Sequence, residues 1–179
     1  MTHDTLNTTP FEPKIYVVCA EDKQAKDKHG AWINANQSVE EIHDDINQML
    51  SKSPRSNAKK WVIQDYDDFG DIYLKNNTTN PNVEEISKVA LILSKYGDLG
   101  AQIIIHHNKY LDEALSALDE MYCGAYESET DYAIQLMNDF SSIPDNLLFY
   151  FDYDKFKRDL FAVDYYSIEI RGTCHVFHN

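Results

Sequence analysis

Short apolar runs of strand-forming residues occur three times in the first part of the chain. Lys14–Val18, Gly30–Asn34 and Trp61–Gln64 each combine β-branched or aromatic residues over a few positions, a pattern typical of β-strands. We therefore predict three short strands with polar segments between them. The Asp65–Asp71 segment that follows the third run is predicted to be an acidic loop.

A helix is predicted between the second and third runs. Apolar residues recur at helical spacing from Val39 onwards. Ser38 stands three positions before Glu41, which matches the capping box S-x-x-E, in which both side chains satisfy free N–H groups at a helix start. This order of elements predicts a small β-β-α-β domain over residues 14–78, preceded by a flexible tail at residues 1–13.

Helical periodicity dominates the middle of the chain. An apolar stripe runs from Val83 to Leu93, and Gly97 stands where a helix C-cap belongs. The Gly100–His107 stretch fits either a buried strand or a buried helical turn, and we expect a helix because helices flank it. Together these patterns predict a helical domain over residues 79–121.

Four further segments with helical character are predicted beyond this point. Leu111–Tyr122 is amphipathic, with its acids mostly opposite the apolar stripe. Ser128 can cap a helix that runs to Phe140, and Pro144 can open a short turn or helix. Tyr153–Phe161 also has helical spacing.

The end of the chain has the pattern of a β-hairpin. Tyr166–Ile170 and Cys174–Phe177 are strand-like runs joined by Arg171–Thr173, which contains a glycine. We therefore predict an α+β C-terminal domain over residues 122–179. The whole chain is predicted to be a multi-domain α+β protein.

Charge is unevenly distributed and strongly acidic, with a formal net charge of -14. Residues 1–60 carry nine acids and eight bases, whereas residues 61–179 carry 21 acids and eight bases. Phosphates would be repelled, which argues against direct binding to nucleic acid or to an anionic membrane surface. A basic protein is the natural complement. Three widely spaced cysteines, with no signal peptide or transmembrane run, indicate free thiols in the cytoplasm.

Between Tyr110 and Asp154 the chain has no lysine, arginine or histidine. A folded domain usually mixes its surface charges, because like charges repel in the compact state. We interpret this acidic segment as a surface for a partner that normally binds a polyanion. Its eleven carboxylates are Asp112, Glu113, Asp119, Glu120, Glu127, Glu129, Asp131, Asp139, Asp145, Asp152 and Asp154.

The residues give little indication of a cofactor or of catalysis. Read as an EF-hand, the Asp65–Asp71 loop has Phe69 at position 5, where calcium needs an oxygen ligand, and Asn76 at position 12, where it needs a bidentate Glu. There is no glycine-rich phosphate loop and no zinc spacing. We predict a protein that is not an enzyme and has no cofactor. The alternatives are a divalent-metal protein or enzyme using this loop, or an acidic adaptor for another basic DNA-binding protein.

The Leu147–Asp154 segment combines aromatic residues with acids. Its rings are more numerous than one face can bury, so a protein–protein contact is expected to take some of them.

Three segments, at Gln64–Phe69, Tyr150–Phe161 and His175–Phe177, resemble the ArdA antirestriction proteins in order and spacing. The second of them, with its F-D-Y-(acid)-x-(aromatic)-x-R-D-L core, is the most specific. The similarity extends from about Lys14 to Asn179.

The resemblance implies an elongated, three-domain homodimer that mimics duplex DNA and blocks the DNA-binding groove of type I restriction–modification enzymes, at their methyltransferase core. It also implies an antirestriction motif near the dimer contact, which would include Ile143, Pro144, Phe149, Tyr150, Phe151 and Tyr153. Because residues 1–60 are nearly neutral, we expect the mimicry to concentrate in the second and third domains.

Overall fold

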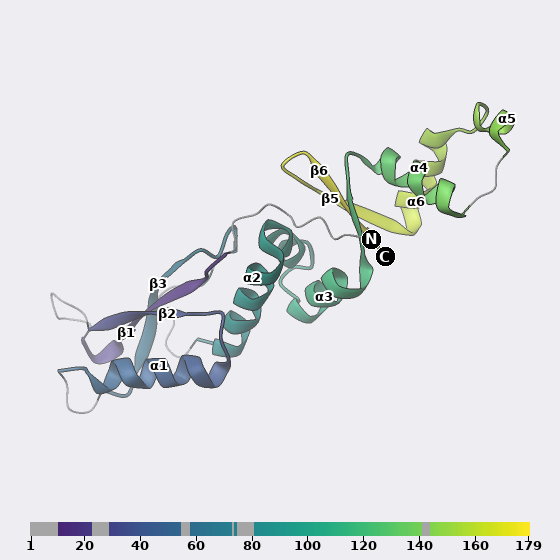
Figure 1. The fold of residues 1–179 in the computed structure, drawn as a ribbon. Helices are drawn as coiled ribbons and strands as arrows, with labels where there is room; N and C mark the ends of the chain where they lie inside the picture. Colours follow the sequence, from purple (N-terminus) through teal and green to yellow (C-terminus); the bar gives the residue numbers. More distant parts are fainter. Residues whose placement is uncertain (1–10, 23–28, 55–57, 73, 75–80, 141–143) are drawn as a thin grey trace. The chain divides into compact units, whose positions relative to one another are not determined.

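The computed structural model divides the chain into two compact units, residues 1–114 and residues 115–179. Each unit contains a three-stranded antiparallel sheet together with helices (Figure 1), which confirms the α+β class. The division into three domains stays a prediction. The residues that the structure describes are 11–22, 29–54, 58–72, 74, 81–140 and 144–179. Most of the predicted tail lies outside them.

The sheet of the first unit has the strand order β2-β1-β3. Its strands are β1 (Lys14–Cys19), β2 (Gly30–Asn34) and β3 (Trp61–Asp67), and a 3-10 turn, η1 (Ala20–Asp22), follows β1. All three predicted strands are therefore confirmed.

The predicted acidic loop is wrong in its first half, because β3 continues to Asp67. Tyr16 of β1 pairs with Asp65, and Lys14 pairs with Asp67. Both aspartates are exposed, whereas Tyr66 between them is half-buried. Alternation along the strand thus keeps the carboxylates in water while pairing continues.

Helix α1 (Val39–Ser51) begins at the predicted capping box. The backbone N–H of Glu41 donates to Ser38 Oγ at 3.3 Å, and the N–H of Ser38 donates to Glu41 Oε2 at 2.9 Å. The buried face of the helix, which includes Ile42 and Ile46, packs toward β2. The cap and the apolar stripe together explain why this segment is helical.

Helix α2 (Val83–His106) is longer than the predicted stripe and contains a kink at Gly97. There φ is 59° and ψ is -138°, a backbone conformation accessible mainly to glycine. A second helical stretch follows directly, which confirms the helix expected over Gly100–His107. Ser94 Oγ donates to the Phe11 carbonyl at 3.1 Å, so α2 contacts the segment leading into β1.

The predicted Leu111–Tyr122 helix is wrong at its end. Helix α3 (Leu111–Ser116) is followed by a π-helical turn, η2 (Ala117–Met121), and then by strand β4 (Tyr122–Tyr126). The strand forms because residues far along the chain supply its partner, β6.

The sheet of the second unit has the order β4-β6-β5. Strands β5 (Tyr165–Ile170) and β6 (Thr173–His178) confirm the predicted hairpin. Three helices accompany this sheet: α4 (Glu129–Phe140), α5 (Asp145–Leu148) and α6 (Tyr153–Val163). The helices predicted at Ser128, Pro144 and Tyr153 are thus confirmed.

Tyr132 of α4 is the centre of the second core. Its ring centroid lies 5.0 Å from those of Tyr126 and Tyr165 and 6.1 Å from that of Phe161. These contacts join α4 to β4, β5 and α6. The three cysteines of the chain are free thiols, as predicted.

Candidate partner-binding surface

The acidic segment runs through six consecutive elements, from α3 to the first turn of α6. Nine of its eleven carboxylates belong to exposed residues, and Glu129 is half-buried. The side chain of Asp145 lies outside the described part of the structure. The exposed residues are Asp112, Glu113, Asp119, Glu120, Glu127, Asp131, Asp139, Asp152 and Asp154. Folding therefore leaves most of these charges in water rather than burying them in pairs.

Two of these acids lie in the first unit, where each has a basic neighbour. Lys88 Nζ is 3.5 Å from Asp112 Oδ1 and 3.4 Å from Glu84 Oε1. The hydrogen bond to Glu84 and the nearby charge of Asp112 raise the pKa of Lys88. His107 Nδ1 is 3.7 Å from Glu113 Oε2. Exposed pairs of this kind contribute little to stability and exchange readily for another cation.

Several acids of the second unit have structural roles that fix their positions. Asp152 caps α6 by accepting from the N–H of Lys155 at 2.9 Å. Glu129 accepts from Ser167 Oγ at 2.8 Å, and Ser116 Oγ donates to Glu120 at 3.1 Å. Carboxylates held in this way form a preorganised array, which reduces the entropy lost on binding.

The aromatic segment divides into exposed and half-buried rings. Phe149 is 89% exposed and Tyr150 is 80% exposed, and their centroids lie 5.5 Å apart. Phe151 instead packs at 4.9 Å from Tyr153 and at 5.4 Å from Phe156. Pro144 is exposed, while Ile143 lies outside the described residues. Two adjacent rings in water are consistent with a contact that another chain covers.

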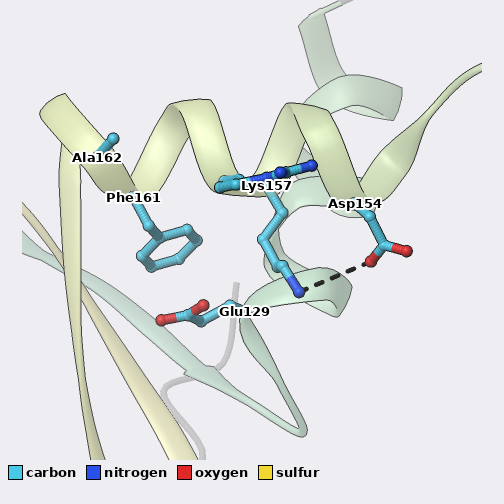
Figure 2. A pocket seen from close by; sticks show the side chains of 6 residues that line it. Glu129, Asp154, Lys157, Phe161 and Ala162 are labelled. Carbon is cyan, nitrogen blue, oxygen red and sulfur yellow. Dashed lines mark ion pairs between the residues drawn. The ribbon is translucent and has the colours of Figure 1, made fainter.

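A pocket of ≈ 440 Å³ lies where α6 faces the start of α4 (Figure 2). Lys157 Nζ is 3.7 Å from Asp154 Oδ1. The pocket brings together two acids of the acidic segment with two bases, which sequence reasoning did not anticipate. Only the resemblance to the Tyr150–Phe161 motif drew attention to those positions. The lining residues are Glu129, Asp154, Lys157, Arg158, Phe161 and Ala162.

The described acids of the Asp65–Asp71 segment have protein hydrogen-bond partners or lie in β3. Among the described residues, no three His, Cys, Asp or Glu side chains are grouped so as to hold a metal ion. Asp71 accepts a hydrogen bond from Gln102 Nε2 at 3.2 Å, and Asp68 accepts one from the N–H of Glu12. The acids of the predicted loop thus bind protein groups separately.

These features define an acidic α+β protein with nine exposed carboxylates in one segment of the chain. A family model described as "Antirestriction protein (ArdA)" matches residues 15–174. The chain therefore belongs to the ArdA family of antirestriction proteins, which are inhibitors of type I restriction enzymes. Among curated proteins, the comparison finds no match. Within the described residues, no helix combines the length and apolar character needed to cross a membrane.

Proposed function

We propose that this chain inhibits a type I restriction–modification enzyme by mimicking duplex DNA. Its acidic array would occupy the DNA-binding groove of the methyltransferase core and exclude DNA by competition. The observation that carries the proposal is the exposure of nine carboxylates in a segment without a single basic residue. A DNA-binding groove is basic, so it attracts such a field as it attracts phosphates.

The net charge of the chain favours mimicry of a short length of duplex by a concentrated group of carboxylates. Duplex DNA carries one charge per ~1.7 Å of axis, so the net charge of one chain replaces roughly 24 Å of duplex. A homodimer would replace about 48 Å. Mimicry by clustered carboxylates of the second unit, doubled by a dimer, therefore matches the available charge better than uniform coverage.

We further propose that Phe149 and Tyr150 contribute to the dimer contact, with Pro144 beside them. Their exposure in a monomer is costly, because burying aromatic surface stabilises by about 25 cal/mol per Å². Aromatic residues are also enriched at protein interfaces. Phe151 and Tyr153, which are half-buried and pack on each other, belong to the same proposed motif, as does Ile143.

The test is displacement of a labelled duplex from a purified type I methyltransferase core. The expected result is complete displacement, with one dimer replacing one DNA. The adaptor alternative is tested by the same titration on an unrelated basic DNA-binding protein. Equal displacement from both would favour a general acidic adaptor, and no displacement from several type I enzymes would exclude the proposed mechanism.

A further inference from the structure

The sheet of the first unit has one apolar face, and the opposite face carries a row of aromatic and polar residues. Residues paired directly across antiparallel strands project to the same side of a sheet. Ile15 and Ile33 are such a pair and are buried. Tyr16, the next residue of β1, pairs with Trp32 of β2 and with Asp65 of β3. These last three residues therefore form one row across the opposite face.

The two rings of this row adjoin each other. The centroids of Tyr16 and Trp32 lie 5.2 Å apart with planes inclined by 43°, and Trp32 is 51% exposed. Gly30 makes room for this arrangement, because a Cβ there would lie 3.1 Å from Tyr16 Cζ and 2.7 Å from Val18 Cγ1. The row thus presents an adjoining pair of rings, of which Trp32 is exposed and Tyr16 is half-buried.

Exposed carboxylates lie next to the rings of Tyr16 and Trp32 in the sheet. Asp65, at the end of the row, is exposed, and so is Asp67 two residues on. Lys14, which pairs with Asp67 in the register, has its Nζ 3.0 Å from Glu12 Oε2. The positive charge of Lys14 is therefore balanced locally, and the aromatic row retains the field of its carboxylates.

An aromatic face next to a carboxylate fits a cation. Rings attract cations through their quadrupole, most strongly at Trp. A guanidinium suits the row better than an ammonium, because it is planar, stacks on rings and binds carboxylates in a bidentate manner. A nucleobase could also stack, but the net charge of the chain repels its phosphates.

We propose that the row Trp32–Tyr16–Asp65 is a docking site for an arginine side chain. The identity of the partner rests on the proposed function: the arginine would belong to the DNA-binding groove of the inhibited enzyme. The first 60 residues are nearly neutral. Even so, the first unit would add one specific contact to the diffuse electrostatic attraction exerted by the acidic segment.

The direct test uses capped hexa-arginine and hexalysine peptides as probes. The chain has two tryptophans, of which Trp61 is 8% exposed and Trp32 is 51% exposed, so quenching of fluorescence reports mainly on Trp32. We expect hexa-arginine to bind about two- to fivefold more tightly than hexalysine, the advantage of one exposed cation–π contact. Equal affinities, or stronger quenching by oligothymidine than by either peptide, would overturn the proposal.

Matched variants test whether the preference for arginine over lysine comes from the row Trp32–Tyr16–Asp65. Calorimetry should show the preference for arginine lost in Asp65→Asn and Trp32→Leu. It should be kept in Asp44→Asn, which removes an exposed carboxylate from α1, and in Leu91→Ala, which removes a side chain that is also 51% exposed. Asp65→Asn preserves the shape of the side chain, so it tests the site even if Trp32→Leu unfolds. Retention of the preference in Asp65→Asn would overturn the proposal.

The enzyme assay separates the two proposals. If the wild-type chain displaces DNA while Asp65→Asn requires about two- to fivefold more protein, the loss expected for one exposed charge pair, both proposals stand. If the wild-type chain displaces DNA and Asp65→Asn matches Asp44→Asn, the docking site is wrong and the proposed function survives. If the wild-type chain fails to displace DNA, the proposed function is wrong, and the peptide preference alone decides whether the arginine site exists.

Discussion

The hydroxyl of Tyr122 lies 2.9 Å from Nδ1 of His175 inside the second unit. His175 is 2% exposed, and Tyr122 stacks on it with ring centroids 6.0 Å apart. Burial lowers the pKa of His175 and raises the pKa of Tyr122 to about 12. The imidazole is therefore neutral at pH 7, and its Nδ1 can accept the hydrogen bond of the hydroxyl.

This buried histidine makes the second unit less stable in mild acid. Because the pKa of His175 is lower in the folded than in the unfolded chain, the unfolded state binds more protons as the pH falls below 6.5. The free energy of unfolding should then decrease by up to about 1.4 kcal/mol per pH unit for this one proton. Urea unfolding between pH 5 and 8 measures the slope. Above pH 7.5 the contribution should be constant.

The matched control is His175→Gln, which has no titrating ring. Its unfolding free energy should depend less steeply on pH than that of the wild-type chain over the same range. Other groups titrate equally in both proteins, so the difference isolates His175. Identical slopes would contradict the assignment.

The kink in α2 depends on glycine at position 97. Gly97 has a φ of 59° and a ψ of -138°, so a side chain there is strained. Gly97→Ala should lower the free energy of unfolding by about 1–3 kcal/mol. Thermal unfolding followed by circular dichroism measures the change. Leu91→Ala, at an exposed site of the same helix, should stay within about 0.5 kcal/mol, and an equal effect of both substitutions would argue against backbone strain.

Local signals explain which elements could be predicted. The α1 capping box at Ser38 and the hairpin turn at Gly172 were recognisable because the required residues are neighbours in the sequence. Strand β4 was missed because its apolar pattern continues that of the preceding helix. Only pairing of Tyr126 with Cys174, far along the chain, makes it a strand.

Local sequence signals likewise predict only part of the candidate site. The exposed acids were predictable from the absence of lysine and from amphipathic spacing. The aromatic row was not, because a register shift between Tyr16 and Val17 decides that Asp65 lies opposite Tyr16. Sequence alone likewise did not place Glu129 of α4 in one pocket with Lys157 of α6.

Neutralising several carboxylates of the acidic segment should weaken inhibition progressively. A single Asp→Asn change within this segment should have little effect, because its field is spread over many groups. The triple variant Asp119→Asn, Glu120→Gln, Glu127→Gln should raise the concentration for half-maximal displacement of DNA by about tenfold, roughly 0.5 kcal/mol for each charge. The matched control neutralises Glu40, Asp44 and Asp45 of α1. A larger effect of the control triple would place the main contact in the first unit instead.

Removing the exposed rings should dissociate the proposed dimer. Phe149→Ala together with Tyr150→Ala deletes side chains that are 89% and 80% exposed, so the fold of the second unit should tolerate the change. Sedimentation equilibrium should show the wild-type chain as a dimer and the double variant as a monomer. The Val163→Ala variant, which removes another exposed apolar side chain, should remain dimeric. A monomeric wild-type chain, or a dimeric double variant, would reject this contact.

The most direct test of the central claim is the apparent dissociation constant of duplex DNA for a type I methyltransferase core, measured at increasing concentrations of this chain. Mimicry predicts a linear increase without a plateau, because DNA and the chain exclude each other from one groove. An increase that reaches a plateau would indicate binding at a separate surface, and an unchanged dissociation constant would contradict DNA mimicry.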